Sequence, residues 1–170
     1  MWISHGPLAE AILRPETEPT QSFDSQVGFV ERLYNLSDTI RSVPLQSPDA
    51  DDEIRESCLC AIDLLRKTHA SAVHSEVGAR RIWAWPFELP PSFPKLLAKG
   101  NPVALIILAH FVSLVREFEG QSWFVEGWSK NVQAMVEKSL DQPWRAWVDW
   151  PRQCVSGDLG LNVESRHSAS

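Results

Sequence analysis

The sequence predicts an all-α fold: a single helical domain of about six to seven helices arranged around a central buried helix at about 101–118. Two observations carry this prediction. Apolar residues recur every three or four positions through most of the chain, which is the spacing of one helix face. Prolines and glycines separate these periodic stretches, and the polar–apolar alternation typical of strands is almost absent.

The composition is that of a soluble globular domain, which we expect to extend over residues 1–154 without an internal boundary. Of the 170 residues, 44% are hydrophobic and 22% are charged. The net charge is -6 and the 16 lysines and arginines are scattered, so we expect no direct nucleic-acid contact by this chain. The start, MWISHGPLAE, lacks the features of a secretory signal, and we therefore expect an intracellular protein of the cytoplasm or nucleus.

The amino-terminal stretch is predicted to contain an arm and then a first long helix. We expect residues 1–23 to form a loosely packed arm that includes a short helix at 4–13, because its proline-rich part is typical of an exposed loop. Beyond it, apolar residues spaced by three and four predict a helix over about 24–42, which Pro44 ends.

The clearest amphipathic pattern begins after Ser47. Four carboxylates in its first turn favour the positive end of a helix dipole, and the apolar stripe that follows continues to about Glu76. Within this helix Cys58 and Cys60 should point to different faces, because residues two apart differ by about 200° around a helix. Together with Cys154 they make an odd number of thiols, and we expect neither a disulfide framework nor a zinc site.

A segment rich in proline and aromatic residues follows, WAWPFELPPSFP. Each residue before a proline is pushed toward extended conformations, so we expect an irregular stretch from Trp85 to Pro91. A brief helix at about 92–99 should then end at Gly100.

The next stretch, NPVALIILAHFVSLV, is apolar on nearly all sides. Asn101 is a suitable N-cap and Pro102 suits the first helical position, so the stretch predicts a helix that other elements surround. The thirteen residues from Val103 to Val115 would span roughly 20 Å as a helix, which is short of the ~30 Å hydrocarbon layer of a membrane. We therefore expect no membrane span.

Two further helices complete the predicted fold. The first runs over about 123–140 with an apolar face that includes Met135, and the second is a short helix begun by Pro143 and ended by Pro151. The remaining residues, 155–170, are small and polar, and we expect a flexible tail.

Few residues are arranged for catalysis or metal binding. His110 and Ser113 lie three apart on one helix face, where they could pair as base and nucleophile. We favour a structural reading, in which the serine bonds a carbonyl of the preceding turn and a neutral histidine bonds a carbonyl or carboxylate. His69 and His74 lack the spacing of a helical metal pair, and we expect both to be solvated. The sequence predicts no metal and no cofactor.

The order of the tryptophan and proline motifs resembles that of one known family. The segments WPFELPPSFPKLLAKG, NPVALIILAHF, WFVEGW and PWRAWVDWP follow one another as in the C-terminal regulatory domain of fungal zinc-cluster transcription factors of the sterol-uptake-regulator-like group. The similarity covers about Gln26 to Gly157. It implies an all-α ligand-sensing domain, which in the sterol regulators binds ergosterol in a hydrophobic pocket. The family's six-cysteine zinc cluster is absent from this chain, so the resemblance implies no DNA reading by it.

We therefore predict that the domain binds a small hydrophobic molecule, either a sterol-like compound or another polycyclic metabolite. Tryptophan offers a large apolar face and one N–H donor, which suits a rigid ligand of this kind. The candidate ligand-binding residues are Trp85, Phe87, Leu108, Phe111, Trp123, Phe124 and Trp128.

The sequence leaves two alternative functions open and also suggests an assembly state. The chain could be a stand-alone, cofactor-independent isomerase or cyclase of fungal secondary metabolism, in which His110 moves a proton and adds ~10²–10⁴ in rate. It could also have a core without a cavity and act only through a protein interface. Members of the resembled family generally have further helices ahead of Gln26, whose loss would expose apolar core, so we expect a homodimer.

Overall fold

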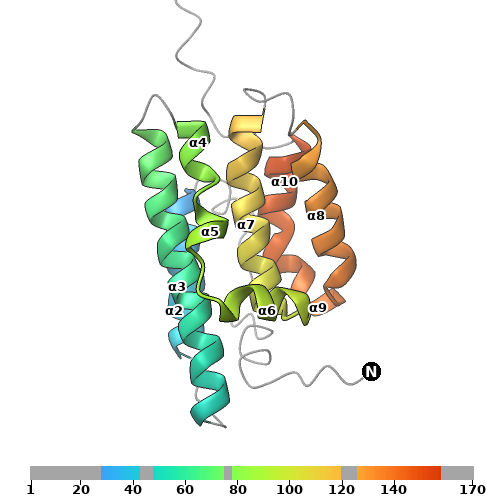
Figure 1. The fold of residues 1–170 in the computed structure, drawn as a ribbon. Coiled ribbons are helices and arrows are strands. Elements are labelled where there is room, and N and C mark those ends of the chain that lie inside the picture. The colour runs from blue at the N-terminus through green and yellow to red at the C-terminus, as the bar shows by residue number, and fades with distance from the viewer. Residues whose placement is uncertain (1–27, 43–47, 75–77, 120–125, 158–170) are drawn as a thin grey trace, which may run out of the picture. The chain divides into compact units, whose positions relative to one another are not determined.

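The computed structural model describes four stretches of the chain, residues 28–42, 48–74, 78–119 and 126–157. Within these stretches the fold is all-α, with seven helices of at least five residues and no strand (Figure 1). The predicted fold class is therefore confirmed. The chain divides after Ile107 into two compact units, here called the first unit and the second unit. The expected helix at 4–13 and most of the expected tail lie outside the described residues.

The first unit is built around one long helix, α3. Its elements are α2 (Phe29–Ser42), α3 (Pro48–Val73), α4 (Gly78–Ile82), α5 (Trp85–Glu88), α6 (Ser92–Ala98) and the start of α7 (Pro102–Glu119). Helix α3 contacts α2, α4, α5 and α6.

Helix α2 runs antiparallel to α3, as two ring contacts show. Phe29 lies 4.8 Å from the ring of His69, and the Arg66 guanidinium lies 4.0 Å from the centre of the Tyr34 ring. His69 is thus half-buried, which corrects the expectation that it is solvated, while His74 is exposed. The predicted helices of this region are confirmed, and Cys58 is buried while Cys60 is exposed.

The segment after α4 is not irregular throughout, and the prediction for it was wrong at its start. Residues Trp85–Glu88 form the single helical turn α5, with Pro86 in the first turn. A proline is tolerated there because an N–H at that position has no helical acceptor. The indole of Trp85 is fully buried, and its Nε1–H donates to the Ala61 carbonyl at 2.9 Å, which ties α5 to α3.

The corner between α6 and α7 follows the predicted capping chemistry. Gly100 has a φ of 69°, and the Asn101 N–H donates to the Leu96 carbonyl at 2.9 Å, which closes the end of α6. The side-chain Oδ1 of Asn101 accepts the N–H groups of Val103 at 3.0 Å and Ala104 at 3.2 Å. One asparagine therefore ends α6 through its backbone and begins α7 through its side chain.

Helix α7 is buried around most of its circumference. Residues 103–107 and 109–115 are all buried, including the polar side chains of His110 and Ser113. This confirms the predicted buried helix. In the described stretches no single helix is long and apolar enough to cross a membrane, and α6 with α7 would reach that length only across a bend of 101°.

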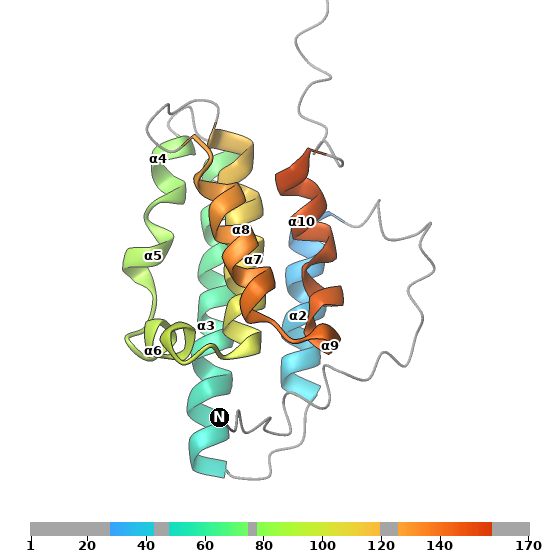
Figure 2. The same ribbon diagram turned by 90° about the vertical axis from the view of Figure 1, so that its right-hand side faces the viewer.

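The second unit consists of the rest of α7 followed by α8 (Trp128–Ser139), α9 (Gln142–Arg145), η3 (Ala146–Val148) and α10 (Asp149–Ser156). Figure 2 shows α9 beyond the end of α8, where the chain turns into α10, and α8 and α10 pack on each other. Gly127, with a φ of 81°, precedes α8, so this helix begins later than predicted. Pro151 lies in the first turn of α10 and does not end it, and Val155 is buried, so the tail begins beyond α10.

The buried face of α8 differs from the predicted one. Ser129, Gln133, Val136 and Leu140 form its buried stripe, whereas Met135 is 50% exposed. The prediction assigned only apolar residues to the buried face of this helix, but the first two residues of the observed buried stripe are polar. The partner of Ser129, which is described below, explains its inward position.

Candidate functional site

The predicted ligand-binding residues fall into both units. In the first unit Trp85 is fully buried and packs edge-on against Phe93, with the ring centres 6.0 Å apart, and Phe87 is 88% exposed. Trp85 is therefore part of the packed core of the first unit, and Phe87 lies on its surface.

The remaining predicted residues belong to the second unit or to undescribed sequence. Phe111 is buried and meets the Trp128 ring edge-to-face at 6.3 Å, and Leu108 is partly buried. Trp123 and Phe124 lie outside the described residues. Of the predicted ligand-binding residues in the second unit, the structure thus describes three: Leu108, Phe111 and Trp128.

His110 is held by packing and lies beside an aromatic ring. It is 4% exposed, and its ring stacks on Trp150 of α10 with 6.1 Å between the ring centres. The Ser113 hydroxyl donates to the His110 backbone carbonyl at 2.7 Å. This confirms the structural reading of Ser113, because a hydroxyl bonded one turn back within its own helix is not poised as a nucleophile.

Glu117 continues the polar face of α7 that begins with His110 and Ser113. The three residues are spaced by three and four, so they lie along one face of the helix. Glu117 is partly buried, and burial raises the pKa of its carboxyl from 4.5 to about 7. Near neutral pH this side chain is therefore partly protonated and can donate a hydrogen bond as well as accept one.

Glu119, the last residue of α7, is a buried acid that caps the start of α8. Its side chain is 2% exposed and accepts hydrogen bonds from the Ser129 hydroxyl, from the Ser129 N–H at 3.3 Å and from Arg116 at 3.2 Å. Burial works against ionisation, yet these bonds hold the pKa of Glu119 below its usual value. Because Gly127 has no side chain to cap α8, Glu119 fills that role from the preceding helix, which explains why Ser129 faces inward.

Two further buried side chains of the second unit carry an unused polar atom. The Gln133 amide N–H donates to Glu137 at 3.1 Å, but the Gln133 Oε1 atom has no hydrogen-bond partner among the described residues. The same holds for the indole Nε1 of Trp144, a side chain that is 1% exposed. A buried polar atom left unpaired costs about 1–3 kcal/mol. The second unit therefore contains one spare acceptor and one spare donor in its interior.

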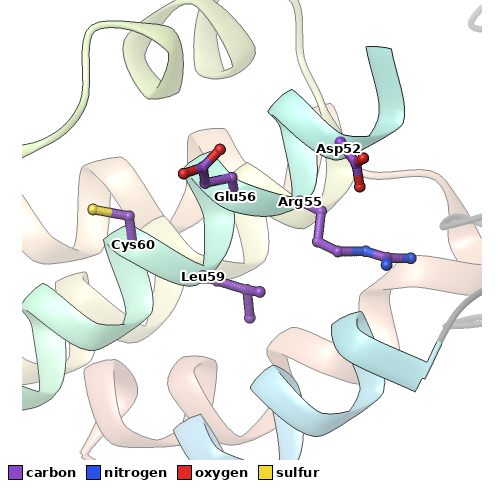
Figure 3. A pocket seen from close by; sticks show the side chains of 5 residues that line it. All are labelled: Asp52, Arg55, Glu56, Leu59 and Cys60. Carbon is purple, nitrogen blue, oxygen red and sulfur yellow. The ribbon is translucent and has the colours of Figure 1, made fainter. Parts of the chain in front are cut away.

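The surface of α3 carries an open hollow of about 480 Å³, but its lining differs from the predicted site. Figure 3 shows its five side chains, all of which come from α3: Asp52, Arg55, Glu56, Leu59 and Cys60. Three of them are exposed, none is aromatic, and a single helix cannot enclose an apolar ligand. We therefore place the candidate site in the interior of the second unit.

Of the buried aromatic residues of the second unit, the sequence prediction had chosen Phe111 for ligand binding but neither Trp144 nor Trp150, and it did not place Ser129 or Gln133 in the interior. Ser129, Gln133 and Glu119 stand in a region that was predicted from apolar spacing alone, and the one available signal was the lack of a capping side chain at Gly127. In the described residues no three His, Cys, Asp or Glu side chains are grouped as metal ligands. Comparisons with protein families, with curated proteins and with solved structures found no match to this chain.

Proposed function

We propose that the second unit binds a small, largely apolar molecule that carries one hydrogen-bonding group, such as a sterol-like or other polycyclic metabolite. The observation that carries this proposal is the pair of unpaired buried atoms, Gln133 Oε1 and Trp144 Nε1. A hydroxyl both donates and accepts, so it could satisfy an acceptor, a donor or both. A ligand with a hydroxyl would offset part of the cost of burying these groups.

The buried aromatic side chains of the second unit support an apolar ligand body. The large side chains of the second unit include the rings of Phe111, Trp144 and Trp150, all buried. Aromatic rings contribute broad flat contact surfaces to a rigid ligand. In this proposal His110 helps to line the ligand site together with Trp150, because its ring stacks on the Trp150 ring.

The biological role that fits this binding is that of a sensing domain. We propose a regulator of the fungal transcription-factor type, acting in the cytoplasm or nucleus as a homodimer, without a DNA-binding motif in this chain. The motif order from Pro102 to Pro151, which falls largely in the second unit, supports this role by resemblance.

Ergosterol is a suitable first probe, because it combines a polycyclic body with one hydroxyl. Delivered from cyclodextrin, it should raise the melting temperature of the protein and appear as a one-to-one complex in native mass spectrometry. Ergosteryl acetate, which can accept but not donate, should bind at least about tenfold more weakly. Binding of neither compound would count against the proposal, and equal binding of the two would exclude donation from the ligand hydroxyl to Gln133 Oε1.

Two tryptophan variants make a matched pair for this test. Trp144→Phe removes the spare donor and should weaken ergosterol binding. Trp85→Phe removes an indole of the same size whose N–H is already bonded to Ala61, and should leave binding unchanged.

A further inference from the structure

Gln133 and Glu137 form a side-chain pair on α8 that links the interior of the second unit to its surface. Gln133 is 3% exposed, and its Nε2 amide group donates to the Oε1 atom of Glu137 at 3.1 Å. Glu137 lies one helical turn further along α8 and is partly exposed. The other end of the Gln133 amide, its Oε1 atom, is buried and has no hydrogen-bond partner among the described residues.

The chemistry of Glu137 decides which end of the Gln133 amide is left for the interior. A glutamine amide can be turned over with almost no change of shape, and the turn exchanges an acceptor oxygen for an NH2 donor. A carboxylate only accepts hydrogen bonds, so the Gln133 group that faces Glu137 has to be the NH2 group. The turned amide would place one acceptor oxygen against another. Glu137 therefore fixes the buried end of Gln133 as an acceptor.

We propose that Glu137 is the positioning residue that sets the hydrogen-bond preference of the ligand site. With Glu137 in place Gln133 offers an acceptor, so the site selects an alcohol over an ether, ester or ketone that has the same apolar body. An analogue without the donor is rejected because the buried oxygen of Gln133 then stays unpaired. This inference rests on the proposed function and adds to it the polar group that the site prefers and the residue that sets this preference.

The test compares two ligands that differ in one hydrogen-bonding capacity. Ergosterol carries a hydroxyl, which both donates and accepts, whereas ergosterol methyl ether accepts and cannot donate. Both are delivered from cyclodextrin, and their dissociation constants are obtained from the quenching of tryptophan fluorescence. In the parent protein ergosterol should bind at least about tenfold more tightly than the ether.

Glu137→Lys reverses the constraint on the amide. The lysine ammonium donates and cannot accept, so it favours the turned amide, whose NH2 group then lies in the interior. A hydroxyl and an ether oxygen can both accept from this group. The ether should therefore bind the variant at least about tenfold more tightly than it binds the parent, and ergosterol and the ether should bind the variant about equally.

Two further variants accompany Glu137→Lys. Glu137→Gln offers a donor and an acceptor at nearly the same size, so it allows both orientations of the Gln133 amide and should also strengthen ether binding. Glu126→Lys makes the same change of charge as Glu137→Lys at an exposed position and should keep the preference of the parent. Circular dichroism and the melting temperature show which variants are folded.

Gln133→Met assigns the preference to Gln133 itself. The substitution keeps the length of the side chain and removes both ends of the amide, so ergosterol should bind this variant no more tightly than the ether does. If the pair of Gln133 and Glu137 were only structural, its variants would change the melting temperature and leave the ratio of the two dissociation constants as it is in the parent.

The possible results separate this inference from the proposed function. A parent that binds neither ligand overturns both. A parent that binds the two ligands equally retains the proposed function and overturns Gln133 as the acceptor. A preference that persists in the folded Glu137 variants overturns Glu137 as the positioning residue, and so does ether binding that Glu126→Lys strengthens equally. Stronger ether binding in the Glu137 variants alone supports the inference.

Discussion

Replacing Glu117 with Gln should stabilise the protein at pH 8 and have much less effect at pH 5. The substitution keeps the shape and the hydrogen-bonding capacity of the side chain and removes its ability to ionise. Glu117 is partly buried on the face of α7 that also carries His110, and burial raises the pKa of its carboxyl from 4.5 to about 7. The ionised form is therefore the form that the fold disfavours.

The sign and size of the effect follow from proton linkage. Between pH 4.5 and about 7 the folded chain binds the Glu117 proton and the unfolded chain releases it, so the free energy of unfolding falls as the pH rises through this window. One pKa unit corresponds to about 1.4 kcal/mol, and the remaining exposure of the side chain reduces the total. We expect the contribution of Glu117 to fall by about 1–3 kcal/mol between pH 5 and pH 8.

Urea unfolding of the parent and of Glu117→Gln at both pH values measures this difference. The Gln variant should exceed the parent in free energy of unfolding by about 1–3 kcal/mol more at pH 8 than at pH 5. Glu126→Gln, at an exposed position, is the control for removing one negative charge from an acidic chain. An advantage that is the same at both pH values, or that the control reproduces, would refute the reasoning.

Three other outcomes follow from the described contacts. Trp85→Phe should lower the free energy of unfolding by about 1 kcal/mol more than Trp144→Phe, because only Trp85 loses a hydrogen bond, and equal losses in urea unfolding would contradict this. Ser129→Ala should cost about 1–3 kcal/mol at pH 7 through the lost bond to Glu119. Since the pKa of Glu119 is lowered in the folded chain, this contribution is present above the unfolded pKa and is lost as the pH falls through the folded one, so parent and variant should converge in acid. His110→Ala should lower the free energy of unfolding by about 1–3 kcal/mol and leave ergosterol binding intact in the folded fraction. The structural role would be overturned if the parent catalysed a turnover and a folded, ligand-binding His110→Gln variant were at least a hundredfold slower.

The parts of the fold that depend on short-range chemistry could be predicted from the sequence. Gly100, Asn101 and Pro102 specify the end of one helix and the start of the next within three residues, and the structure shows those bonds. The same is true of α2 and α3, whose apolar spacing is regular. In these places the information needed lies within one or two helical turns.

The inward position of Ser129, which the prediction missed, depends on a partner outside that range. Ser129 faces inward because Glu119, ten residues earlier on another helix, accepts its hydroxyl and its N–H. An apolar-spacing argument assigns a serine or a glutamine to the solvent side by default, so it could not place Ser129 or Gln133 in the buried stripe of α8. The helical turn at Trp85 was missed because the rule for residues before proline was applied without asking whether Pro86 fell in a first turn.

The residues that most clearly break the ordinary pattern of burial are Phe87, Gln133 and Trp144. Phe87 is apolar and exposed, and the other two bury a polar atom that lacks a protein partner among the described residues. Each departure costs free energy of the order of 1–3 kcal/mol, which is a large fraction of the stability of a small domain. Residues that contradict their surroundings in this way are expected where function imposes the contradiction. A hydroxyl-bearing ligand could satisfy Gln133 or Trp144, so the proposed function accounts for the burial of a polar atom without a protein partner in the second unit.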